Sequence, residues 1–147
     1  MFGLANSFDH HYDGYQSVLS KYVQNGKVSY ENLKSNEASL TMFLHEIADA
    51  DLTGFSVSQK EAFWINAYNA LTLEVVVAAW PIGSILELEN GKVWDVRKFP
   101  VAHALITLNQ LEGQLRELKD PRIHTAINCA AISCPSLQST PFLPETL

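Results

Sequence analysis

Basic residues are scarce in this chain, and their scarcity limits the partners it can have. Ten lysines and arginines stand against 16 aspartates and glutamates, so the 147 residues carry a formal net charge of −6 at pH 7. A negative surface repels phosphate backbones and anionic headgroups, which argues against nucleic acid or an anionic membrane as the main partner. We expect a small-molecule or peptide-like ligand instead.

Flexible linkers, repeats and an uninterrupted hydrophobic run are also lacking. The longest apolar stretch, residues 62–80, contains Asn66, Asn69 and Glu74, which predicts a buried helix and no membrane span. Residues 1–5 lack the basic region of a signal peptide. Localisation therefore stays open, and a periplasmic or secreted location would require that a leader was removed. Because 47% of the residues are hydrophobic, we expect one globular domain, residues 1–147.

The spacing of apolar residues predicts a mainly helical fold. Between residues 87 and 106 the helical period disappears, and the only sheet is expected there, with short strands around 93–95 and 104–106. The predicted class is therefore α+β, predominantly helical, with a small antiparallel sheet or hairpin. Apolar periodicity and capping residues place the helices over residues 8–23, 38–47, 59–79, 107–118 and 121–131.

Residues 120–137, DPRIHTAINCAAISCPSL, concentrate the chemistry of the chain. Arg122 is a permanent cation with forked donors, and His124 can carry a proton near neutrality. Cys129 and Cys134, the two cysteines of the chain, could act as nucleophiles, metal ligands or a redox pair. Free cysteines are also often buried as small hydrophobic residues. On a helix, Cys129 would be rotated about 140° from His124, which disfavours a direct pair.

Two asparagines interrupt the apolar helix that is expected over residues 59–79. Asn66 and Asn69 are three residues apart and would share one face of that helix. A buried amide without a partner costs about 1–3 kcal/mol, so both side chains need partners. They either tie down a neighbouring loop or orient a ligand or a catalytic base in a pocket.

Several ordered motifs resemble the domain of unknown function 547 family. EAFWINAYNALT at residues 61–72 is similar to its signature, and so are PIGSI at 81–85, TLNQLE at 107–112 and the block at 120–137. YVQNGKVSY at 22–30 resembles its lead-in, so the resemblance covers about residues 15–147. The family usually has histidine where this chain has Gly113, and its chains commonly continue further. The resemblance therefore implies a domain truncated at its C terminus, which could associate through that segment or as a homodimer.

The family brings no established reaction, but the resemblance places several chemically active residues on motif positions. These positions could form a shared site or hold the fold together, for example through a buried Arg122–Glu112 pair. The motif residues are Asn66, Asn69, Glu112, Arg122, His124, Cys129 and Cys134.

Three kinds of function remain open, and whether the domain is an enzyme stays open with them. The preferred one is a small-ligand-binding domain in which Arg122 holds a carboxylate, Asn66 and Asn69 read an amide, and Cys134 contacts a small thiol peptide such as glutathione. The alternative is a thiol-dependent hydrolase or acyl transferase. Its catalytic residues would be Cys129 as nucleophile, His124 as base, and Glu112.

The third kind is a structural or interaction domain without a site. A metal site would need His124, Cys129 and Cys134 together with His103 or Glu112, but the paired spacing that is typical of zinc sites is missing. We therefore predict no metal and no cofactor.

Overall fold

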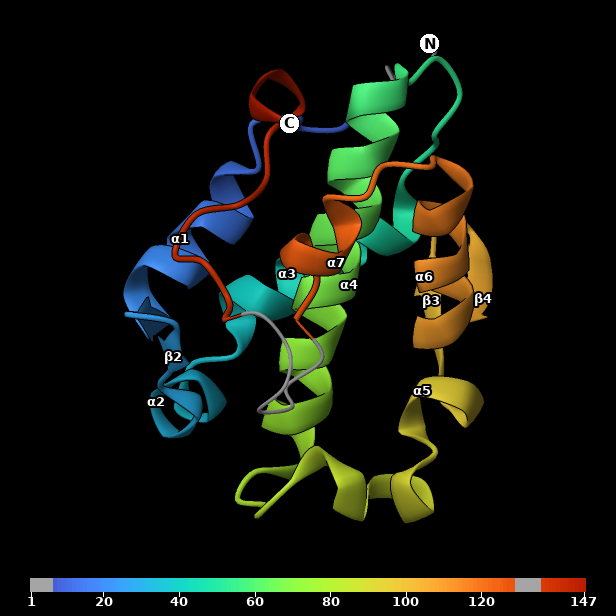
Figure 1. Cartoon of the computed structure of the whole chain (residues 1–147). Helices are drawn as coiled ribbons and strands as arrows, with labels where there is room; N and C mark the ends of the chain where they lie inside the picture. Colours follow the sequence, from blue (N-terminus) through green and yellow to red (C-terminus); the bar gives the residue numbers. More distant parts are fainter. Residues whose placement is uncertain (1–6, 129–135) are drawn as a thin grey trace, which may run out of the picture.

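One long helix, α4 (Val57–Ala79), forms the centre of the molecule (Figure 1). The computed structural model describes residues 7–128 and 136–147. Ser56 begins α4 with a capping box: its hydroxyl accepts from the Gln59 N–H at 3.1 Å, and the Gln59 side chain accepts from the Ser56 N–H at 2.8 Å. Pro81, which cannot continue a helix, follows the C-cap residue Trp80. The helix expected over residues 59–79 is confirmed.

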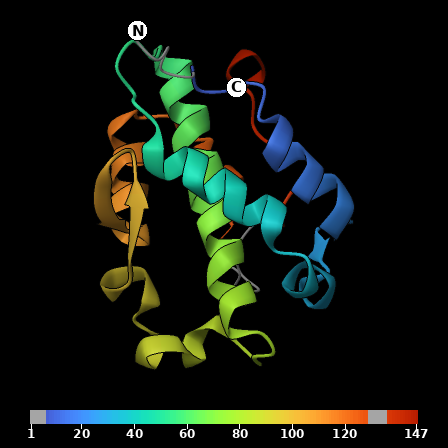
Figure 2. The same cartoon turned by 180° about the vertical axis from the view of Figure 1, so that it is seen from behind.

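Two groups of elements pack on opposite sides of α4 (Figures 1 and 2). Helices α1 (Asp13–Tyr22) and α2 (Tyr30–Ser35) lie on one side, and α3 (Ala38–Asp49) crosses α4 obliquely from that side toward the other (Figure 2). The 3₁₀ segment η1 (Ile85–Gly91) leads to the other side, which consists of α5 (Val93–Val96), β3 (Lys98–Val101), β4 (Ala104–Thr107) and α6 (Leu108–Glu117). The chain then crosses in front of α4 through α7 (Ile123–Ala126) in the view of Figure 1. The 3₁₀ segment η2 (Pro144–Thr146) lies near the C terminus of the chain.

The expected fold class is confirmed: 59% of the structure is helical, with two small antiparallel sheets. β1 (Val23–Gln24) pairs with β2 (Lys27–Val28), and β3 pairs with β4. The β3–β4 turn holds Ala102 and His103 at positive φ, and their N–H groups donate to the carbonyls of Ile47 and Ala48 at 2.9 Å. The hairpin thereby satisfies carbonyl groups at the end of α3 that the helix itself leaves unpaired.

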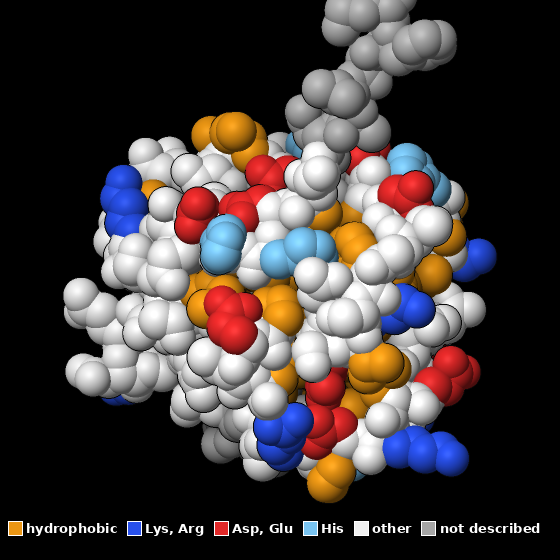
Figure 3. All heavy atoms as spheres, turned by 90° about the horizontal axis from the view of Figure 1, so that it is seen from above, with side chains coloured by type: hydrophobic (Ala, Val, Ile, Leu, Met, Phe, Trp, Pro, Cys, Tyr) orange, Lys and Arg blue, Asp and Glu red, His pale blue; other side chains and the backbone are white. Residues whose placement is uncertain are grey.

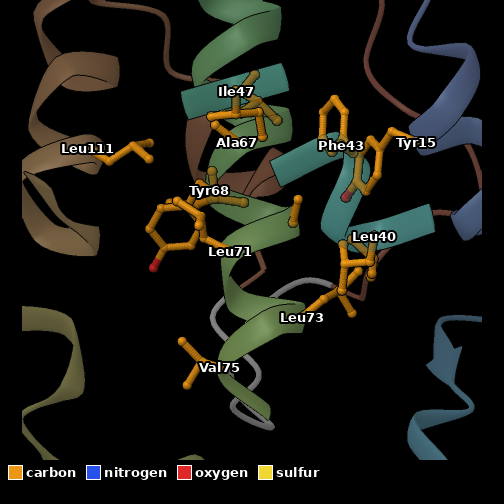
Figure 4. Packing of buried hydrophobic residues seen from close by; sticks show 14 of the residues in the cluster. Tyr15, Leu40, Phe43, Ile47, Ala67, Tyr68, Leu71, Leu73, Val75 and Leu111 are labelled. Carbon is orange, nitrogen blue, oxygen red and sulfur yellow. The ribbon is translucent and has the colours of Figure 1, made fainter. Parts of the chain in front are cut away.

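The hydrophobic core surrounds α4 on most of its circumference. Phe63, Tyr68, Leu71 and Val75 are at most 4% exposed, which confirms their expected place in the core, while Trp64 is partly buried. Figure 4 shows Tyr68 and Val75 pointing toward the α5 and α6 side and Leu73 pointing toward Leu40 of α3. A helix that is apolar all round suits burial on both sides. By length and composition α4 could also cross a membrane, yet 78% of its most apolar window is buried inside the protein.

Several expected element boundaries are wrong. The first helix begins at Asp13 rather than at residue 8, because Tyr12 is left-handed at φ 56° and the Asp9 carboxylate accepts from the N–H groups of His11 and Asp13. Residues 93–95 belong to helix α5 and not to a strand. β1–β2 is a second hairpin where one sheet was expected.

The helix expected over residues 121–131 is also wrong. α7 spans only four residues, and Ile127 is extended at φ −90° and ψ 139°. The 140° rotation between His124 and Cys129 therefore does not apply, because no continuous helix links Ala126 to Asn128. Positions 129–135, including Cys129 and Cys134, lie outside the described residues.

Candidate functional site

Asn66 on α4 holds the backbone of Phe142 with both atoms of its amide. Its Nδ2 donates to the Phe142 carbonyl at 2.7 Å, and its Oδ1 accepts from the Phe142 N–H at 2.9 Å. Asn66 is 0% exposed. The side chain therefore satisfies its main donor and acceptor on the backbone of a residue 76 positions away.

Asn69, one turn further along α4, does the same for the segment after α7. Its Nδ2 donates to the Ala126 carbonyl at 3.0 Å, and its Oδ1 accepts from the Asn128 N–H at 2.7 Å. The spacing of three residues puts both amides on one helix face, as the sequence predicted. Both asparagines thus tie down neighbouring chain, which was one of the two roles expected of them.

The two asparagines fix the chain on either side of both cysteines. Asn128 precedes Cys129 in the sequence, and Phe142 follows Cys134 by eight positions. The later flank has further contacts, because Leu137 is only 5% exposed and the Gln16 side chain donates to the Ser139 carbonyl at 3.5 Å. The expected roles of the cysteines, as nucleophile or ligand contact, fall on positions that the structure does not describe.

The side chains of Glu61, Asp120 and Arg122 form a cluster that joins the segment before α7 to the first turns of α4. The Arg122 guanidinium donates to the Asp120 carboxylate through Nε at 3.0 Å and Nη2 at 2.6 Å, and the Arg122 N–H donates to the same carboxylate at 2.9 Å. Asp120 in turn lies within hydrogen-bond reach of Glu61. Exposure rises outward through the cluster: Glu61 is 6% exposed, and the side chains of Asp120 and Arg122 are 15% and 60% exposed.

The electrostatics of this cluster put one proton between two carboxyl groups. Burial and the neighbouring Asp120 raise the pKa of Glu61 from 4.5 to about 7. The hydrogen bonds from Arg122 hold the pKa of Asp120 well below its usual range. Glu61 therefore carries the proton and donates to an ionised Asp120, which is the usual outcome when two carboxyl groups cannot both ionise.

His124 and Glu112 are not part of this cluster. Glu112 is paired with Arg116 on its own helix, at 2.6 Å between Oε2 and Nη2. The expected Arg122–Glu112 pair is therefore wrong, because each residue has a nearer partner of opposite charge. His124 is exposed on α7, while His103 lies in the β3–β4 turn against α3. Within residues 7–128 and 136–147, no histidine and carboxylate side chains are arranged as metal ligands.

Glu61 and Asp120 are functional candidates that the sequence reading missed. Asp120 was expected only as a helix cap, and Glu61 only as the first residue of a motif. The available signal was an acidic residue at the start of an otherwise apolar helix, because an acid is almost never fully buried without a partner.

These features define a predominantly helical domain in which motif residues of α4 are linked to the segment that follows α6. Residues 52–147 match the family described as Protein of unknown function, DUF547, and the chain belongs to this family. The motifs at 61–72, 81–85, 107–112 and 120–137 all lie within the match, whereas the lead-in at 22–30 precedes it. No curated protein and no solved structure matches the chain.

Proposed function

We propose that this domain binds a small ligand with a carboxylate group, which Arg122 holds on the surface of residues 120–128. The ligand class is a small thiol or peptide-like carboxylate, because Cys129 follows this surface directly in the sequence. In this proposal, Asn66 and Asn69 act as positioning residues for the chain around the ligand and do not contact it.

The observation that supports the proposal is the contact between Glu61 and Asp120. Two carboxyl groups in a largely buried contact cannot both ionise without cost, and burial and Asp120 raise the pKa of Glu61 to about 7 for this reason. What the contact provides is orientation: Glu61 fixes Asp120, and Asp120 fixes the guanidinium by a bidentate bond. A pre-oriented arginine loses less side-chain entropy when it binds a carboxylate. Nη1 of Arg122 takes no part in the Asp120 bonds and is a donor for the ligand.

A thiol-dependent hydrolase or acyl transferase is the second candidate. The pKa of about 7 for Glu61 favours it, because a group that titrates near the working pH can both give and accept a proton. Cys129 would be the nucleophile and His124 its base. Glu112 is a weaker candidate for this chemistry because its carboxylate is engaged with Arg116.

The experiment is a calorimetric titration of the full chain with glutathione. Arg122→Gln should weaken binding about tenfold or more, because the charge-assisted hydrogen bond from Nη1 to the ligand carboxylate is lost. Arg116→Gln is the matched control, since its side chain is 61% exposed and also pairs with an acid at 2.6 Å. It should leave the affinity unchanged. Equal effects of the two variants, or no saturable binding by the parent chain, would contradict the proposal.

Cysteine variants then separate the two candidates. Under the binding proposal, Cys134→Ser should reduce the affinity for glutathione but not for its S-methyl derivative. Under the enzyme proposal, Cys129→Ser should abolish formation of an acyl-enzyme with a thioester probe, observed as a mass increase of the intact chain.

A further inference from the structure

A cavity of about 1000 Å³ opens between the end of α3 and the segments packed around it. Residues 7–10, the loop 50–55 and the β3–β4 turn supply the other walls. The Glu61–Asp120–Arg122 cluster contributes no residue to it. Its volume is that of a typical small-molecule site.

Acidic, aromatic and imidazole side chains form most of the lining of this cavity, together with small and polar residues, and the acids of α3 and the following loop are exposed to solvent. Four carboxylates line it, and among its described lining residues there is no lysine or arginine. Figure 3 looks onto this face of the molecule: acidic and histidine side chains gather about its centre, and lysine and arginine side chains lie toward its edges. The charged and titratable lining residues are Asp9, His10, His45, Glu46, Asp49, Asp51 and His103.

Two acidic residues lie at the C-terminal end of α3, where the helix dipole favours basic residues. Glu46 and Asp49 lie in its last turn, where the backbone carbonyls already present partial negative charge. Acidic side chains destabilise that end of a helix, whereas a bound cation would be attracted by the carboxylates and the helix terminus together. Burial raises the pKa of Glu46, and the negative charge of the nearby Asp9 raises it further.

One wall of the cavity is built from packed rings. The His10 ring meets the Phe55 ring edge-on at 4.5 Å and the Phe8 ring at 5.3 Å. His10 Nδ1 is buried and has no hydrogen-bond partner within the described part of the chain. Burial also lowers the pKa of His10, which favours the neutral ring. Aromatic faces attract cations and accommodate the apolar body of a ligand.

We infer that this cavity binds an organic ammonium compound with an aromatic or apolar body. The ammonium group lies among Glu46, Asp49 and Asp51, and the body lies against Phe8 and Phe55. A metal ion is not the favoured occupant, because the described histidines and acids are not arranged as a ligand set. The inference is independent of the carboxylate site at Arg122.

The test is a calorimetric titration of the full chain with phenethylammonium and with phenylacetate, which share a body and carry opposite charges. Phenethylammonium should bind saturably at one site, and phenylacetate should not bind. The double variant Glu46→Gln/Asp49→Asn should weaken phenethylammonium binding about tenfold or more, because its nearest counter-charges are removed. It should also melt no earlier than the parent chain, because these acids oppose the helix terminus.

The control variant is Glu31→Gln/Glu117→Gln, which removes the same net charge from exposed positions outside the cavity. It should change the affinity by less than about twofold, since neither residue lines the cavity and exposed charges are screened by salt. Equal binding of phenylacetate, or equal weakening by both double variants, would overturn the inference. Stoichiometric binding of zinc alone that displaces phenethylammonium would overturn it in favour of a metal site.

Discussion

Replacing Glu61 with glutamine should stabilise the protein at alkaline pH and leave it unchanged at acidic pH. Glutamine keeps the donor that protonated Glu61 offers to Asp120, but it cannot ionise. In the folded chain Glu61 holds its proton up to about pH 7, while in the unfolded chain it releases it near 4.5. Folding therefore binds a proton between these values, and the Glu61 contribution to stability falls as pH rises from about 4.5 to 7.

The size of the effect follows from the two pKa values. The difference between 4.5 and about 7 corresponds to about 3 kcal/mol, at about 1.4 kcal/mol per pKa unit. Little solvent screening reduces this figure, because Glu61 is only 6% exposed. The glutamine variant should thus be up to about 3 kcal/mol more stable than the parent chain at pH 8, and the two should be equal below pH 4.5.

Urea unfolding of both chains, measured from pH 4 to pH 9, checks this expectation. The difference in free energy of unfolding isolates Glu61, since the other titrating groups are common to both chains. It should increase through the interval from about 4.5 to 7 and then stay constant. A difference that is independent of pH, or a variant less stable than the parent chain at pH 8, would refute the shared proton between Glu61 and Asp120.

The other predictions concern the contacts that hold the chain around the cysteines. Asn66→Ala should lower the free energy of unfolding by about 2 kcal/mol, because two hydrogen bonds to Phe142 are lost. The control in urea unfolding is Asn32→Ala, at an exposed position. An equal loss of stability in the two variants would contradict this role of Asn66. Gly26→Ala should be destabilising for two reasons, a φ of +76° and a new Cβ that would lie 2.7 Å from Cβ of Ser136. Gly54→Ala is the control, because its φ is +83° and no atom lies within 4 Å of the added Cβ. Equal melting temperatures of the two alanine variants would show that the contact between Ser136 and the β1–β2 turn is not close enough to matter.

The sequence predicted those parts of the fold that depend on local chemistry. α6 was placed by its capping box and α4 by apolar residues that follow Ser56 and Ser58, and the two helices begin where Thr107 and Ser56 cap them. Elements without a strong local signal were missed. β1–β2 has only two residues per strand, and α5 is a single turn in a segment whose β-branched residues suggested a strand.

The site could be predicted only in part, because charge pairing depends on how distant segments meet. The need of Asn66 and Asn69 for partners followed from their place in an apolar helix. Their partners at Ala126, Asn128 and Phe142 did not, since these lie 57 to 76 positions away. The Arg122–Glu112 pair that the sequence suggested is wrong for another reason, since each residue pairs with a carboxylate or guanidinium close to it in the chain, Asp120 and Arg116.

The asparagine contacts also make two distant parts of the chain depend on the helical state of α4. Asn66 and Asn69 face the same way only when α4 is helical, because their three-residue spacing has no common direction in an extended chain. The four hydrogen bonds to Ala126, Asn128 and Phe142 are therefore possible only where α4 is helical. Local unfolding of α4 around these two residues would release the backbone on both flanks of residues 129–135, although about 50 residues separate the end of that helix from Asn128.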